Sequence, residues 1–300
     1  MELRQLKYFV KVAELKNFSA AAKALNITQS TLSQQIRQLE QELGVELLIR
    51  DSRHVQLNDM GEAFLPSARR TLTEATACVD RIHDVQHLQA GILNIGSTFT
   101  FSILLEETVL SFNRKYPNIK LNICCYSMEE LMEKLRKGEI DVALSYKPSE
   151  SYEDIDSHIL FDNHLCIIAR KDHPLADRKT LRFQELEDWK FALPAKGLQA
   201  RNAFDRLVNG QSYHLDVSIE VNDADILLDL VAESNMLTIL SFATSRHNER
   251  VKAIPLDYPN TGMEGCFHVR KGTYMKHATK EFLRMLCENK IYDMTLVDIL

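Results

Sequence analysis

The stretch from Phe18 to Leu43 constrains the fold of this 300-residue chain most, because it predicts two short helices joined by a tight turn. The first helix is expected to begin at Ser19, whose hydroxyl can cap free N–H groups, and to continue through three alanines. Thr28 can cap the second helix, expected over Gln29–Leu43. Small alanine side chains let the second helix pack close and steeply, as a helix-turn-helix requires.

The second of these helices has one apolar and one polar face. A leucine or isoleucine recurs every three or four residues, which predicts a buried stripe of Leu32, Ile36, Leu39 and Leu43. The polar face carries no acid in its first two turns; Glu40 and Glu42 follow only where a docked helix would leave a DNA groove. Hydroxyls, amides and a guanidinium can bond base edges or phosphates. The candidate DNA contacts here are Ser19, Gln29, Ser30, Thr31, Ser33, Gln34 and Arg37.

A solvated helix face would carry the same residue types, so only the flanking segments can distinguish a DNA-binding helix from an ordinary exposed one. Residues 2–15 predict a third helix backing the pair, with an apolar stripe of Leu3, Leu6, Phe9, Val10 and Ala13. Gly44 is expected to end the second helix, and two short apolar runs around Asp51-Ser52-Arg53 predict a two-stranded wing. Arg50 and Arg53 are candidates for contact with sugar-phosphate or the adjacent minor groove, although surface arginines are common on hairpins.

Residues 1 to about 65 resemble the winged helix-turn-helix of the LysR-type transcriptional regulators, through Leu6, Phe9, Phe18, Ala20, Ala21, Ala22, Leu25, Thr28, Gln29, Ser30, Leu32, Ser33, Ile36, Leu39, Glu40, Leu43, Gly44, Leu47, Arg50, Leu57 and Gly61. Gln34 stands where an arginine is frequent, and Asn58 where a threonine usually starts the next helix. The resemblance implies a regulator that binds double-stranded operator DNA.

A long helix is predicted from Asn58 to about residue 89. Steps of four and three residues repeat along it through Gly61, Leu65, Ala68, Leu72, Ala75, Val79 and Ile82. This spacing is typical of a seam for a partner helix. We therefore expect a homodimer or homotetramer held by Leu65, Ala68, Leu72, Ala75, Val79 and Ile82, with packing on its own domain as the alternative.

From Gly91 onward strands and helices alternate, which predicts a parallel sheet covered by helices. Two such halves resemble the effector domain of the same family, itself similar to periplasmic solute-binding proteins. The expected fold is an all-α winged helix-turn-helix (1–58), a linker helix (59–90) and a two-lobed α/β effector domain (91–300). By the resemblance, the first lobe is about residues 91–161 and 267–300, and the second about 162–266. Since the chain crosses twice, a ligand between the lobes can bend them.

Ligands of open α/β sheets bind beyond the carboxyl ends of the strands, near helix N-termini. The residues at those positions are Ser97, Thr98, Thr100, Ser127, Lys196, Gly197 and Asn222. Ser97 and Thr98 match the family's ligand-contacting turn; for each residue alone, helix capping is the competing role. Hydroxyls, N–H groups and Lys196 favour an anionic small-molecule effector. Departures from the family occur at Glu233–Met236, in place of a glycine-rich turn, and at Ser241, in place of a frequent proline.

Charge and cysteine content separate the remaining alternatives. Residues 1–58 carry +2 and the rest −8, so a weakly basic head on an acidic body favours specific over indiscriminate DNA binding. None of the six cysteines forms a C-x-x-C pair. Cys166 and Cys266 lie on the two crossing segments and are expected to approach each other, which leaves a redox-sensing regulator as the alternative.

The sequence contains no nucleotide-binding glycine loop, nucleophile elbow or zinc-protease motif, which argues against an enzyme. We expect no catalytic site, no metal and no cofactor. No apolar run of membrane-spanning length and no export signal is present, so a cytoplasmic protein without a membrane partner is predicted, and a solute carrier is disfavoured. RNA polymerase is a further partner to consider.

Overall fold

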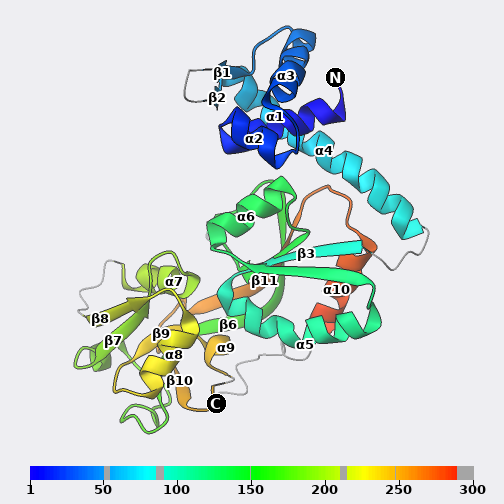
Figure 1. Cartoon of the computed structure of the whole chain (residues 1–300). Coiled ribbons are helices and arrows are strands. Elements are labelled where there is room, and N and C mark those ends of the chain that lie inside the picture. Colours follow the sequence, from blue (N-terminus) through cyan, green and yellow to red (C-terminus); the bar gives the residue numbers. More distant parts are fainter. Residues whose placement is uncertain (51–54, 86–90, 149, 210–214, 247, 289–300) are drawn as a thin grey trace. The chain divides into compact units, whose positions relative to one another are not determined.

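The computed structural model describes residues 1–50, 55–85, 91–148, 150–209, 215–246 and 248–288 (Figure 1). It divides into two compact units, residues 1–88 and residues 89–300. Each unit has its own hydrophobic core. They are therefore described separately.

The first unit consists of four helices and a short hairpin: α1 (Leu3–Leu15), α2 (Phe18–Ala24), α3 (Gln29–Leu43), β1 (Leu48–Arg50), β2 (Val55–Leu57) and α4 (Asp59–Val85). The prediction for α3 is confirmed at both ends, because Thr28 accepts a hydrogen bond from the Thr31 amide and Gly44 ends the helix at φ 70°. The predicted start of α2 was wrong. Asn17, not Ser19, caps this helix, since its Oδ1 accepts from the Ala20 amide at 2.9 Å.

The core of the first unit lies between α1, α2, α3 and the hairpin. Leu32, Ile36 and Leu39 are fully buried, as the stripe on α3 predicted. On α1 the stripe is shifted from the predicted one: Leu3 is 51% exposed, whereas Val12 is fully buried. The helix turns Leu6, Phe9 and Val12 inward at steps of three, so the first apolar residue of the segment falls outside the core.

The hairpin is the predicted wing. Its strands β1 and β2 pair antiparallel, with Leu48 opposite Leu57 and Arg50 opposite Val55. The tip, including Arg53, lies outside the described residues, as does the side chain of Arg50. The wing is therefore anchored by two three-residue strands that begin and end at its root.

The second unit is the predicted α/β domain, and its strands and helices follow in the order β3 (Gly91–Ser97), α5 (Phe99–Lys115), β4 (Ile119–Cys125), α6 (Met128–Lys137), β5 (Val142–Tyr146), β6 (Ile155–Arg170), η1 (Phe183–Leu186), β7 (Lys190–Pro194), α7 (Gln199–Val208), β8 (Asp216–Val221), α8 (Ala224–Ala232), β9 (Thr238–Ser241), α9 (Phe242–Ser245), β10 (Val251–Pro255), β11 (Gly262–Arg270) and α10 (His277–Glu288). Strands β3, β4 and β5 are parallel, as are β7 and β8. The sequence did not predict β10, η1 or α9.

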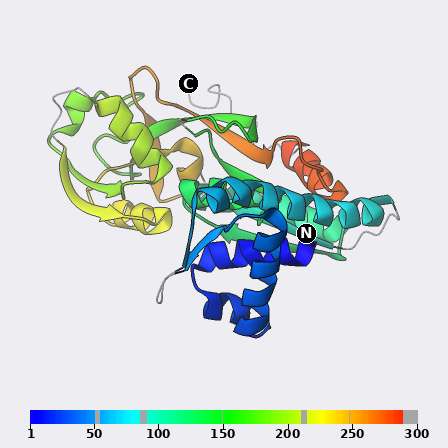
Figure 2. The same ribbon diagram turned by 90° about the horizontal axis from the view of Figure 1, so that it is seen from above.

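Two long strands connect the lobes, as the double crossing predicted. Strand β6 pairs antiparallel with β11 from Gly262 opposite His164 to Arg270 opposite Ile155, and β11 also pairs with β5 of the first lobe. Strands β9 and β10 of the second lobe pair with the far part of β6. In Figure 2, β6 (green) and β11 (orange) run from the lobe that contains α7 and α8 to the lobe that contains α5 and α10.

The register of these strands separates the two cysteines that we expected to approach each other. Cys266 lies opposite Ile159, whereas Cys166 is seven residues further along β6, opposite Pro255 and Leu240. At ~3.3 Å per residue this corresponds to about 23 Å. Both thiols are free and buried, so the expected approach was wrong.

Candidate nucleic-acid interface and ligand site

The exposed face of α3 is built as the sequence predicted. Gln29, Ser30, Thr31, Gln34 and Arg37 are exposed, and Ser33 is half-buried. Ser19 on α2 is exposed beside them and its Oγ donates to Gln29 Oε1 at 2.8 Å. This hydrogen bond joins the two helices at the polar surface, so the predicted contact residues of α2 and α3 form one continuous face.

Hydroxyl groups gather at the start of α3. Thr28 Oγ1 lies 2.9 Å from Ser30 Oγ and 2.8 Å from Thr31 Oγ1. Each hydroxyl can rotate to donate or accept, so this cluster can adapt to either type of hydrogen-bonding group on a ligand. Two turns later, the Arg37 guanidinium has no hydrogen bond or ion pair with any residue that the structure describes, and so its donors are available.

The two acids that follow on α3 differ in placement. Glu42 is exposed and pairs with the ammonium group of Met1. Glu40 is only 8% exposed, and its Oε1 accepts a hydrogen bond from the Leu47 amide at 3.0 Å. Glu40 therefore does not simply lie beyond the docked turns, as the sequence suggested, but is directed inward to the root of the wing.

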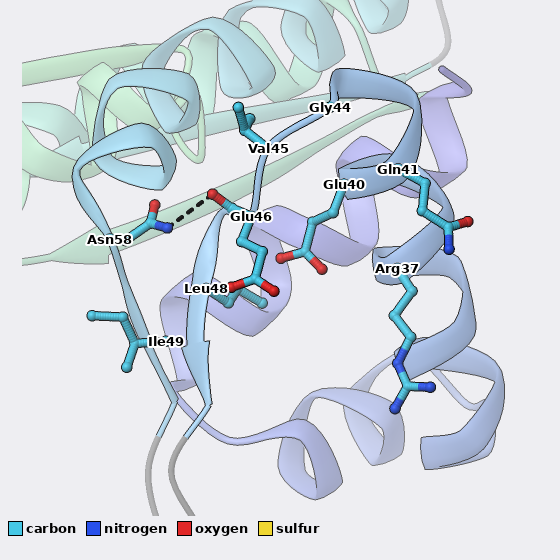
Figure 3. A pocket seen from close by; sticks show the side chains of 9 residues that line it. All are labelled: Arg37, Glu40, Gln41, Gly44, Val45, Glu46, Leu48, Ile49 and Asn58. Atoms are coloured by element: carbon cyan, nitrogen blue, oxygen red, sulfur yellow. Dashed lines mark hydrogen bonds between the residues drawn. The ribbon is translucent and has the colours of Figure 1, made fainter.

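An open groove of about 740 Å³ lies between α3 and the wing (Figure 3). It is lined by Arg37, Glu40, Gln41, Gly44, Val45, Glu46, Leu48, Ile49 and Asn58. Figure 3 shows the Arg37 side chain on the α3 side and Ile49 on the wing side. The groove separates the two elements for which we predicted DNA contact.

Asn58 closes the groove at the root of the wing. Its Nδ2 donates to Glu46 O at 2.8 Å, and its Oδ1 accepts from the Gly61 amide at 2.9 Å. The second bond caps α4, so asparagine replaces the family's usual threonine without loss of the cap.

Only the later part of the predicted seam for a partner helix along α4 is exposed. Ala68 is 1% exposed in the core of its own unit, so the structure leaves it no surface for a partner and contradicts that assignment. Leu65 and Leu72 are half-buried against the same core. Toward the end of the helix, Val79 is 54% and Ile82 58% exposed. The repeat of four and three residues serves the unit's own core at first and leaves apolar side chains uncovered only later.

In the second unit, Ser97 and Thr98 lie at the junction of β3 and α5. Ser97 is fully buried with its Oγ 3.7 Å from Cys125 Sγ. Thr98 is the N-cap residue of α5 and is 7% exposed. Its Oγ1 is buried and has no hydrogen-bond partner among the described residues. The side chain of Thr100 lies outside those residues.

The other predicted ligand residues have different roles or surroundings. Ser127 caps α6 in a capping box with Glu130, the competing role that the sequence left open. Lys196, Gly197 and Asn222 are exposed, and Asp223 rather than Asn222 caps α8. The pKa of the Glu220 carboxyl is lowered by the hydrogen bond from Arg201, and to a smaller extent by the charge of Lys196.

A buried polar network that the sequence did not predict joins the lobes around Tyr146 at the end of β5. Its hydroxyl donates to Ser241 Oγ and accepts from Asn163 Nδ2, both at 2.6 Å. Gln199, the first residue of α7, donates to Tyr146 O at 2.9 Å and accepts from the Tyr146 amide at 3.2 Å. Burial raises the pKa of the Tyr146 hydroxyl. The departure at Ser241 was the available sequence signal, since proline has no such hydroxyl.

The cysteines provide no activated thiol in the crossing strands. Burial raises the pKa of Cys166 to about 12 and that of Cys266 to about 11, so both remain protonated at neutral pH. Among the described residues, no group of three or more acidic, histidine or cysteine side chains is arranged to hold a metal ion. In the same part of the chain, no helix is both long and apolar enough to cross a bilayer.

A winged helix-turn-helix joined to a two-lobed α/β domain defines a DNA-binding regulator with a domain for a small ligand. Residues 3–62 match the bacterial regulatory helix-turn-helix proteins of the lysR family, and residues 86–290 match the LysR substrate binding domain. The chain belongs to the LysR family of transcriptional regulators. Its matched domains and relatives are those of regulators and not of enzymes.

Individual relatives agree with this assignment. The chain is 34% identical to the transcriptional regulator YnfL of Escherichia coli over 83% of its length and 86% of that protein. It is 32% identical to the transcriptional dual regulator GltC of Bacillus subtilis, covering 86% of this chain and 87% of that one. Among solved structures, full-length OxyR from Pseudomonas aeruginosa shares the fold with a TM-score of 0.70 at 23% identity, covering 99% and 96% of the two chains. CbnR in complex with its target DNA has a TM-score of 0.56 at 24% identity, covering 96% and 99%.

Proposed function

We propose that this regulator reads its operator with α3 in the major groove and the wing at the adjacent minor groove. The observation that carries this proposal is the exposed face of α3, which offers hydroxyls, amides and one guanidinium and no acid over its first two turns. Such groups bond base edges and phosphates without repelling the DNA backbone. The candidate contacts are Ser19, Gln29, Ser30, Thr31, Ser33, Gln34 and Arg37, with Arg50 and Arg53 on the wing.

The groove between α3 and the wing is proposed to accommodate one strand of the DNA backbone. When a helix occupies the major groove and a hairpin reaches the neighbouring minor groove, the sugar-phosphate strand that separates the two grooves has to pass between them. The groove of about 740 Å³ opens between these two elements, and the strand is proposed to pass at its Arg37 end, away from the carboxylates of Glu40 and Glu46 that also line it. Arg37 is therefore assigned to phosphate or base contact at the edge of the major groove.

Two copies of the chain would place two α3 helices in successive major grooves, roughly 34 Å apart. The exposed residues Val79 and Ile82, together with half-buried Ala75, are the surface of α4 that supports self-association. Leu65 and Leu72 contribute only through the surface that their own unit leaves free.

The second unit is proposed to bind a small anionic effector beside Ser97 and Thr98. Thr98 Oγ1, which is buried and has no hydrogen-bond partner within the described part of the chain, lies at the N-terminus of the 17-residue helix α5, where backbone N–H groups and the helix dipole favour an anion. Lys196, Gly197 and Asn222 are assigned to the opposite lobe's side of this site. Effector binding then shifts the lobes about β6 and β11, alters the paired α3 helices and changes DNA bending and access of RNA polymerase.

The test is binding of the full-length protein to the duplex upstream of its own gene. Log affinity should fall steeply with log salt concentration, and Gln34→Ala should weaken specific binding more than binding to unrelated DNA. Arg50→Ala and Arg53→Ala should flatten the salt dependence. Equal affinity of the unaltered protein for operator and unrelated duplex would contradict the proposal.

A further inference from the structure

The root of the wing is attached directly to α3 by one side chain. Glu40 comes from the last turns of α3, and its Oε1 accepts the Leu47 amide at 3.0 Å. Leu47 immediately precedes β1 and is buried. The carboxylate is an acceptor for a buried N–H group that is not part of the hairpin, and such charge-assisted bonds are stronger than neutral ones.

Glu46 and Leu47, the two residues before β1, are also held by Asn58, the residue before α4. Asn58 Nδ2 donates to Glu46 O at 2.8 Å, and the Asn58 amide donates to Leu47 O at 3.1 Å. Gly61 approaches so closely that an added Cβ would lie 2.1 Å from Leu47 O. Glu46 and Leu47 are thus fixed between α3 and α4, one residue before the wing begins.

The termination of α3 does not depend on the Glu40 carboxylate. Gly44 ends the helix in the left-handed conformation, and the Val45 amide donates to the main-chain carbonyl of Glu40 at 3.2 Å. Removing the carboxylate therefore leaves these main-chain contacts in place. What is lost is the contact between α3 and the wing root.

We propose that Glu40 is a positioning residue, which sets the wing relative to α3 so that the major-groove and minor-groove contacts form on the same DNA at once. The proposal rests on the proposed function, in which both elements bind DNA. The two three-residue strands make few cross-strand bonds, so the wing is held by Leu48 and Val55, which are buried in the core, and by the hydrogen bonds of Glu46 and Leu47 just before β1. The inward direction of the Glu40 carboxylate also keeps this acid off the exposed face of α3.

The experiment uses the full-length protein with its upstream duplex and two footprints in parallel. Methylation protection at guanine N7 reports the major groove, and hydroxyl-radical protection reports the minor-groove edge. The variants are Glu40→Ala, Glu40→Gln, which keeps an oxygen acceptor, and Glu42→Ala, which removes an exposed acid of the same helix.

For Glu40→Ala we expect the major-groove protection to remain, the minor-groove protection to be lost and affinity to fall about tenfold. The salt slope should decrease by about 2, since each of two wings gives up at least one phosphate contact at ~0.9 per phosphate. Glu40→Gln should keep both protections within about twofold of the original affinity, because Oε1 still accepts the Leu47 amide. Glu42→Ala should show both protections unchanged.

Asn58→Ser provides a second route that is independent of Glu40. Serine still caps α4 but does not reach Glu46 O, so minor-groove protection should be selectively weakened here as well. Retention of the minor-groove protection and salt slope in Glu40→Ala would overturn the proposal. So would an equal loss in Glu40→Gln, or, should Glu40→Ala fail to fold, an unchanged footprint in Glu40→Met, which keeps most of the side-chain volume but has no oxygen acceptor for the Leu47 amide. If the unaltered protein protects no duplex, the proposed function itself fails, and the assignment of Glu40 fails with it.

Discussion

Removal of the Tyr146 hydroxyl is predicted to loosen the contact between the lobes. In Tyr146→Phe the ring still packs on Phe101, whose centroid lies 5.1 Å away, but Asn163 and Ser241 each lose a hydrogen-bond partner. Both residues are buried, and an unsatisfied buried group costs about 1–3 kcal/mol. Ser241 keeps its contact with Thr244 at 2.7 Å, so we expect a total loss of about 2 kcal/mol.

The matched control is Tyr116→Phe, which removes a hydroxyl that donates to Glu281 Oε2 at 2.8 Å. Glu281 still forms ion pairs with Arg284 and Lys115, so the free energy of unfolding of this variant should fall by less than about 1 kcal/mol. In calorimetry of the full-length protein, the transition of the second unit should fall by about 4–8 °C for Tyr146→Phe. A shift no larger than that of Tyr116→Phe would refute the reasoning.

Three further predictions concern other parts of the chain. Burial lowers the pKa of His268 to about 4, below the ordinary 6.5, so the unfolded state binds a proton at higher pH than the folded state does. The free energy of unfolding should therefore fall by about 3 kcal/mol as the pH is lowered from 6.5 to 4. His268→Gln should remove that part of the pH dependence in unfolding titrations. Gly61→Ala should destabilise the first unit by more than about 2 kcal/mol because its Cβ would collide with Leu47 O, whereas Gly262→Ala, with open space around it, should change stability by less than about 0.5 kcal/mol in denaturant unfolding. Ile82→Asp should shift the sedimentation equilibrium toward monomer while each unit stays folded, since this side chain is 58% exposed; an unchanged association constant would exclude this end of α4 from the self-association surface.

The sequence predicted the helix-turn-helix most accurately where several local signals agree. Thr28, the apolar stripe and Gly44 all indicate the same boundaries of α3, and the structure confirms them. At α2 we predicted Ser19 as the cap and did not consider Asn17, which lies two residues earlier. Asn17 is used because its side chain reaches the Ala20 amide.

What the sequence could not predict depends on contacts between distant segments. Spacing along α4 is the same whether a residue faces its own core or a partner, so Ala68 was assigned to the wrong surface. The separation of Cys166 from Cys266 follows from the register of β6 and β11, which no local pattern specifies. The link from Tyr146 to Ser241 joins residues 95 apart in the chain. Glu40 was identified as part of the family pattern, but its inward orientation is visible only from the fold.

The most direct test of the account is to place one acid on the face of α3. Ser30 is exposed in the first turn, where an acid favours the helix, so Ser30→Glu should leave Tm unchanged or slightly raised. Ser151→Glu adds the same charge to an exposed loop of the second unit and serves as the control. In fluorescence anisotropy with the upstream duplex, we predict that Ser30→Glu binds at least about 100-fold more weakly while the control binds normally. Undiminished operator binding by Ser30→Glu would contradict the claim that α3 reads the DNA.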